Sequence, residues 1–248
     1  MAAAPTFAEL EAAAERGDDD EVVRLGEAAV AARPGDDAAH ELLARSLLAL
    51  GRLDEAERHA NDAVRIDPEE VGYRELLAEV LAARGAHRDA ADEFARLARN
   101  DPRQSDWELA AARQRLGAAQ PELGADAARR AVRLDPRNGR AQLALSQALA
   151  RIGDAPGALQ AAGAAFHLLG GLAEAREALA DAQWLSDQDA TAFGEFRALA
   201  RELRGPDRDR VLIKARALYL QHAGWLGRLV ASIPPLFRIG FSNGWLNV

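Results

Sequence analysis

The sequence predicts an all-α protein, a right-handed α-solenoid of about six helical hairpins. Pro34, Pro68, Pro102 and Pro136 recur at a constant spacing of 34 residues, and Gly170 takes the next position of the series. Hydrophobic residues make up 49% of the chain but aromatic residues only 5%, because alanine supplies much of the apolar content. Alanine is the best helix former and lets helices approach closely. The repeat and the composition therefore favour closely packed helices.

Each unit is expected to contain two helices joined by a short turn. In the first unit, Gly17 separates helices expected over roughly residues 5–16 and 20–33. In the second unit, an apolar stripe at helical spacing runs along the first helix, and it consists of Leu43, Leu47 and Leu50. Gly51 then ends that helix.

The junction between two units is clearest where Asp67 and Pro68 precede Glu69 and Glu70. Aspartate can cap a helix, and proline suits the first helical position. Glutamates are favourable in a first turn. We therefore expect the next helix to begin near Pro68.

The fourth unit leaves two registers open. At strict spacing, Arg115 falls in the apolar stripe. If Leu116 and Gly117 instead correspond to the end of the helix in the second unit, Leu109 enters the stripe and the next turn is longer by two residues. The third and fifth units return to the plan of the second, whereas the sixth has no glycine at its turn.

The pattern changes after Pro206. Apolar residues then recur every three or four positions from Val211 to Leu229, which predicts an amphipathic helix. The chain is thus expected to divide into a repeat array over residues 3–206, a capping helix over 207–233 and an irregular apolar tail rich in Pro and Gly over 234–248.

The spacing of small and large residues within a unit resembles that of a known repeat family. The third unit has a large residue, leucines and small residues in its first helix, and alanine, an aromatic residue and proline across its second: Arg74, Leu77, Ala78, Leu81, Ala90, Phe94 and Pro102. This pattern resembles that of the tetratricopeptide repeat family. The resemblance covers about residues 3–206, and it departs from the family where Trp and Tyr are expected in the first helix.

The resemblance implies a non-catalytic adaptor or scaffold that binds a protein or peptide in a groove lined by the first helices. The residues expected to face this groove are Glu41, Arg45, Leu48, Glu75, Glu79, Ala82, Arg113, Leu116, Leu143, Gln147, Glu177, Asp181 and Trp184. The alternative is that these side chains only face water. Because Glu75 and Glu79 would repel a carboxylate, we expect a basic or amphipathic ligand near the third unit.

The charge distribution argues against nucleic acid as a partner. The net charge is −8, yet from Asp207 onward six Lys and Arg residues outnumber two Asp residues. The repeat array is therefore strongly acidic, which disfavours contact with a phosphate backbone.

The sequence offers no catalytic or metal-binding motif, so we expect no enzyme, no cofactor and no metal. The segment Gly240–Gly244 fits the G-x-S-x-G pattern, but no strand is expected before it. The histidines show no close ligand spacing: His40, His59, His87, His167 and His222. The absence of cysteine and of a secretory signal leads us to expect a cytoplasmic protein.

The C-terminal region has two readings. The helix after Pro206 can cap the array, or it can dock on a partner or on an anionic membrane surface, which gives the alternative function of a peripheral membrane-associated assembly factor. In the second reading the docking residues are Trp225, Phe237, Phe241, Trp245 and Leu246. An apolar tail also permits homo-oligomers.

Overall fold

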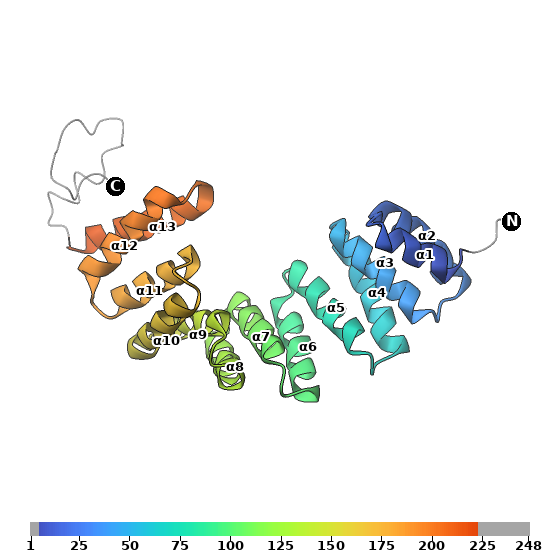
Figure 1. Ribbon diagram of the computed structural model, residues 1–248, viewed down its shortest axis with the longest axis horizontal. Helices are drawn as coiled ribbons and strands as arrows, with labels where there is room; N and C mark the ends of the chain where they lie inside the picture. The colour runs from blue at the N-terminus through green and yellow to red at the C-terminus, as the bar shows by residue number, and fades with distance from the viewer. Residues whose placement is uncertain (1–4, 223–248) are drawn as a thin grey trace. The chain divides into compact units, whose positions relative to one another are not determined.

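The computed structural model describes residues 5–222, and the chain divides into two compact units, Met1–Asp135 and Pro136–Val248. All regular structure in the described residues is α-helical, as the sequence predicts (Figure 1). The helices of the first unit are α1 (Phe7–Glu15), α2 (Asp19–Ala32), α3 (Asp37–Ala49), α4 (Leu53–Ile66), α5 (Val71–Ala83), α6 (His87–Asn100), α7 (Ser105–Gly117) and α8 (Pro121–Leu134). Those of the second unit are α9 (Gly139–Ile152), α10 (Ala155–Leu168), α11 (Ala173–Leu185), α12 (Asp189–Glu202) and α13 (Gly205–His222).

Within each unit the helices pack in the order of the chain. An odd-numbered helix contacts the even-numbered helix that follows it, and the pair forms a hairpin. First helices also contact each other in three cases, α1 with α3, α3 with α5, and α9 with α11. In these cases the first helices of neighbouring hairpins lie beside each other.

The core of the hairpins is built from leucines that meet alanines. Leu43 and Leu47 of α3 are buried, and they belong to one cluster with Ala56 and Ala60 of α4. Both alanines are fully inaccessible, so a larger side chain at either position would separate the two helices. The buried stripe ends at Leu47, because the third predicted member, Leu50, lies at the C-cap of α3 and is 40% exposed.

A residue in the left-handed conformation closes every hairpin turn. The turn residues lie 34 positions apart and have φ values between 54° and 87°: Gly17, Gly51, Gly85, Ala119, Gly153 and Asp187. Glycine adopts this conformation without cost, whereas other residues lose about 1–2 kcal/mol. The sixth unit, which lacks the glycine, keeps the turn with Asp187.

This turn position also decides the register of the fourth unit. Ala119 takes the place of the turn glycine, and α7 and α8 begin 34 residues after α5 and α6. The strict register is therefore correct, and the longer turn does not occur. Arg115 stands at the stripe position, where its guanidinium donates to Gln120 Oε1 at 2.8 Å and to Asp92.

The junction between units differs from the prediction. Pro68 does not begin a helix, since α4 ends with Asp67 as its C-cap and α5 begins at Val71 after Glu70 as its N-cap. Asp67 has an extended backbone, with φ −125° and ψ 93°. A residue that precedes proline is disfavoured in the helical region, so the recurring prolines mark the end of the second helix in the first four hairpins.

Replacing glycine by alanine should change stability in opposite directions at a left-handed turn and inside a helix. Gly85→Ala is expected to lower the free energy of unfolding by about 1–2 kcal/mol, because Ala disfavours the φ of 77°. Gly163→Ala, within α10, is expected to raise it by about 0.5–1 kcal/mol through helix propensity. A Cβ added at either glycine would have no atom within 4 Å, so packing cannot explain a difference. Urea denaturation followed by circular dichroism measures both, and equal effects would contradict the account.

A third variant tests the alanine at the same turn. Ala119→Gly is expected to stabilise the protein by about 0.5 kcal/mol. Relief of the left-handed strain, about 1–2 kcal/mol, outweighs the added flexibility of the unfolded chain, about 0.4–1 kcal/mol. The same denaturation experiment measures the change, and a loss of stability would contradict it.

Candidate functional site

The first helices of the hairpins in the first unit carry an acidic surface, here called the α3–α5 acidic face and defined by Glu41, Arg45, Glu75 and Glu79. Arg45 Nε donates to Glu41 Oε1 at 2.6 Å, so Glu41 is neutralised within its own helix. In the described part of the chain, Glu75 and Glu79 make no ion pair and no hydrogen bond. The face therefore keeps an excess of negative charge on α5.

The electrostatics of Glu79 reflect this excess. Burial raises the pKa of its carboxyl group, and the neighbouring charge of Glu75 raises it further. Arg45 opposes both effects, but the pKa stays above its ordinary value. A cation placed beside Glu79 would stabilise the carboxylate, so the face is favourable for a positively charged ligand.

The remaining predicted groove residues of the first unit differ in exposure. Leu48 and Ala82 are partly buried and pack against the hairpin core, so they present little free surface. Leu116 is buried, with 6% of its surface exposed, whereas Arg113 is exposed. Of the residues predicted to line the groove in the first unit, the charged ones are thus accessible to a ligand, whereas the apolar ones belong to the core.

In the second unit, two predicted groove residues are already occupied by α13. Arg210 Nη2 donates to Glu177 Oε2 at 2.8 Å, and Lys214 Nζ lies 2.8 Å from Glu177 Oε1 and 2.6 Å from Asp181 Oδ2. Glu177 is only 8% exposed. The acidic pair on α11 therefore binds a basic pair, spaced by four residues, on a helix of the same chain.

The two carboxyl groups of this network respond differently to burial. Burial raises the pKa of Glu177, but the hydrogen bonds from Arg210 and Lys214 outweigh it, so the pKa is lowered. Burial also raises the pKa of Asp181, and Lys214 only partly compensates, so that pKa stays above its ordinary value. Glu177 is thus the main ionised anchor for α13.

Of the other predicted residues of the second unit, Trp184 also contacts α13. Trp184 Nε1 donates to Gln221 Oε1 of α13 at 3.2 Å, and the Trp184 ring packs edge-on against Phe196. Leu143 of α9 is buried in a cluster with Ala165 and Ala178, whereas Gln147 is exposed.

The described part of α13 packs as a cap on the last hairpin. Val211, Ala215 and Leu218 are buried, and they form one apolar cluster with Phe193 and Phe196 of α12. For Gly205–His222 the structure therefore favours the capping arrangement over docking on another surface.

The expected docking residues and the G-x-S-x-G segment lie outside the described residues, as do positions 223–233 of the expected capping helix: Trp225, Phe237, Phe241, Trp245, Leu246 and Gly240–Gly244. The division into array, capping helix and tail stays a prediction for that reason. None of the described helices is long and apolar enough to cross a lipid bilayer.

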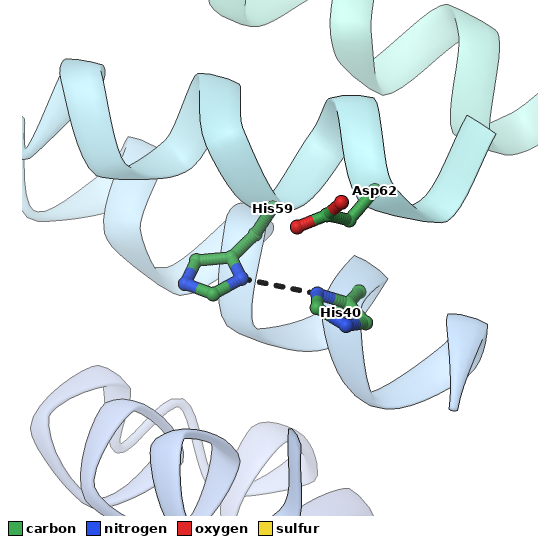
Figure 2. Close-up of side chains that lie close together, drawn as sticks. All are labelled: His40, His59 and Asp62. Atoms are coloured by element: carbon green, nitrogen blue, oxygen red, sulfur yellow. Dashed lines mark hydrogen bonds between the residues drawn. The ribbon is translucent and has the colours of Figure 1, made fainter. Parts of the chain in front are cut away.

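A second constellation joins α3 to α4, and the sequence analysis did not anticipate it. His40, His59 and Asp62 bring ligand atoms within 4.8 Å of one another (Figure 2). His40 is buried, and the other two are partly buried. Burial, and next the neighbouring His40, lower the pKa of the His59 imidazole. The residues come from two helices, which is why short-range spacing rules missed them.

Comparison with known proteins identifies the architecture. A model of the tetratricopeptide repeat family matches residues 7–71, 41–105 and 109–167, which together exceed half of the chain. The chain belongs to the tetratricopeptide repeat family. No curated protein matches it in a comparison of sequences. Tetratricopeptide repeats generally serve as protein–protein interaction modules and are typically non-catalytic.

Solved structures of tetratricopeptide repeat proteins share the fold. A repeat protein from Parabacteroides merdae aligns over 87% of this chain and 90% of its own, with a TM-score of 0.70 and 13% identity. YrrB, described as having an unusual peptide-binding site, aligns over 77% of this chain and 98% of its own, with a TM-score of 0.60 and 18% identity. Yeast Tom70 aligns over 86% of this chain but only 45% of its own, with a TM-score of 0.57 and 16% identity.

The α13 network predicts a large effect for one isosteric substitution. Glu177→Gln is expected to lower the free energy of unfolding by about 1–2 kcal/mol, because it replaces a buried carboxylate that accepts from both Arg210 and Lys214 by a neutral amide. Asp209→Asn, exposed on α13, is the control and should change it by less than about 0.5 kcal/mol. Thermal unfolding of the full chain compares the two.

The same variant gives a pH test. Because the pKa of Glu177 is lowered from 4.5, its stabilising contribution is present above pH 4.5 and is lost as the pH falls through the folded-state pKa. The stability gap between wild type and Glu177→Gln should therefore close on acidification. A gap that widened below pH 4.5 would contradict the assignment of Glu177 as the ionised anchor.

Proposed function

We propose that the chain is a non-catalytic binding module whose α3–α5 acidic face takes a basic, amphipathic segment of a partner protein. Membership of the tetratricopeptide repeat family supports protein binding in general. The peptide-binding site described for YrrB is consistent with a peptide ligand, although the low identity to this chain carries only the fold. The choice of a basic segment rests on this chain's own charges.

One observation carries the proposal. Glu75 and Glu79 on α5 occupy the same repeat positions as Glu177 and Asp181 on α11, three periods of 34 residues earlier. On α11 this acidic pair binds Arg210 and Lys214. On α5 no described residue pairs with the carboxylates, which leaves them available to an equivalent basic pair on another molecule.

The segment that binds α11 indicates what such a ligand looks like. In α13 the basic residues at 210 and 214 alternate with buried apolar residues at 211, 215 and 218. Cations with this spacing lie on one side of a helix, next to its apolar stripe. A basic amphipathic helix would present the same combination to the α3–α5 acidic face.

Charge reversal on α5 tests the proposal. The probe is a fluorescein-labelled peptide with the sequence of residues 207–221, which carries the Arg210 and Lys214 pair. The full chain is expected to bind it, and Glu75→Lys/Glu79→Lys should weaken binding by about tenfold or more in fluorescence anisotropy, since two attractions become repulsions.

A control with the same charge change separates position from net charge. Glu122 and Asp126 are exposed acids with the same spacing on α8, and Glu122→Lys/Asp126→Lys should leave the affinity within about twofold. If both double variants lost binding, the effect would depend on net charge alone and the α3–α5 acidic face would not be the binding site. Undiminished binding by Glu75→Lys/Glu79→Lys would refute the proposal.

A further inference from the structure

We propose that His40, His59 and Asp62 form a binding site for one divalent transition metal ion, such as Zn²⁺, between the two helices of the second hairpin. The site is separate from the α3–α5 acidic face and does not depend on the proposed partner. Two imidazoles and one carboxylate are a suitable ligand set for Zn²⁺, and three protein ligands leave one position for water.

The orientation of His40 is the first observation in favour of a metal. Its Nε2 lies 3.2 Å from the carbonyl oxygen of Pro34, which can only accept a hydrogen bond, so Nε2 carries the proton. In the neutral ring, Nδ1 then presents its lone pair toward His59. A histidine ligand usually donates its second N–H in this way, to a backbone carbonyl or a carboxylate.

The distances between the ligand atoms suit a single ion. His40 Nδ1 and His59 Nδ1 lie 3.0 Å apart in a hydrogen bond that His59 donates, and Asp62 approaches the same space from the next turn of α4 (Figure 2). A metal ion would replace this hydrogen bond, with the His59 proton moving to Nε2. Two nitrogens bound tetrahedrally to Zn²⁺ at 2.0–2.1 Å are about 3.3 Å apart. The nitrogens therefore need to separate by only about 0.3 Å.

The carboxylate can reach the same ion. Asp62 Oδ1 accepts a hydrogen bond from Arg65 at 2.8 Å, but Arg65 is 69% exposed. A surface pair of this kind contributes little stability, so it does not hold Asp62 away from a metal. A change of its side-chain rotamer is enough to complete the ligand set.

Three other hairpins supply the strongest argument, because the third, fourth and sixth carry an ion pair at two or three of the equivalent positions, whereas those positions are uncharged in the first and fifth. In the third hairpin, Arg74 pairs with Glu93 at 2.8 Å, and Arg96 pairs with Glu93 as well. Arg74 also donates to the carbonyl of Pro68, as His40 does to that of Pro34. These residues lie 34 positions after His40, His59 and Asp62.

The fourth and sixth hairpins each carry an ion pair at two of the three positions. Arg130 Nε donates to Glu108 Oε1 at 2.7 Å in the fourth, and Arg176 pairs with Glu195 in the sixth. In each case an arginine supplies the positive charge between the helices. In the second hairpin the same positions hold two imidazoles and a carboxylate and no arginine, and a metal cation would supply the positive charge there.

Zinc binding by the untagged full chain tests this inference. After treatment with a chelator, the protein is titrated with ZnCl₂ by isothermal calorimetry at pH 7.5. We expect one Zn²⁺ per chain with a dissociation constant in the micromolar range or below, and a rise of the unfolding temperature with zinc. Co²⁺ in place of Zn²⁺ should give the visible absorption bands of a tetrahedral site.

The repeat itself provides the matched variant. His40→Arg/His59→Glu installs the pair found at Arg176 and Glu195, so it should keep the helical circular dichroism and lose the zinc-dependent rise in unfolding temperature. Asp62→Asn, a single isosteric change, should weaken zinc binding by about tenfold or more. His167→Gln, at an exposed histidine of α10, should bind zinc as wild type does.

The results of the zinc experiments can be distinguished from those of the peptide-binding experiments on the α3–α5 acidic face. Equal uptake of zinc by wild type and by His40→Arg/His59→Glu would overturn the site, as would an equal loss of affinity in His167→Gln. If the double variant fails to fold, His59→Gln and Asp62→Asn, both at partly buried positions, decide the matter by the same calorimetry. None of these variants alters Glu75 or Glu79.

Discussion

The left-handed residue between the two helices of a hairpin is the constraint on which the architecture depends. It reverses the chain within a few residues, so the second helix packs directly against the first. This residue recurs every 34 positions even where it is Ala119 or Asp187, both at positive φ. Because the turn is fixed, each side chain of one hairpin has an equivalent in the next, and the charges of different hairpins can be compared position by position.

The fold was predictable because the spacing of the apolar residues and the positions of the turn residues indicate the same helices. Leu43 and Leu47 mark the buried face, and alanines such as Ala56 mark the contact between helices. The fourth unit was ambiguous because sequence rules look for glycine at a left-handed turn, and Ala119 gives no such signal. Pro68 misled for a related reason: proline is compatible with the start of a helix and with the position after its end, and local sequence does not distinguish them.

The candidate sites were less predictable, since they depend on side chains that meet across helices. The repeat register identified Glu177 and Asp181 as facing residues, but it did not show that Arg210 and Lys214 of α13 bind them. His40 and His59 are 19 residues apart, outside the spacing of local metal motifs. Alignment of the repeats on one another would have indicated that the two histidines face each other, because the equivalent residues of the third and sixth hairpins form the ion pairs Arg74–Glu93 and Arg176–Glu195.

The hairpin architecture also explains why such exchanges are tolerated. The buried alanines and the left-handed turn hold the helices together, so the three polar positions at the side of the hairpin are not needed to define the fold. In the third hairpin these positions hold Arg74 and Glu93, and in the second His40 and His59. Each pair bridges the two helices of its own hairpin, but in the second hairpin both members offer a ring nitrogen that can bind an ion. A repeat can therefore acquire a ligand site in one hairpin while its neighbour retains a surface for protein binding.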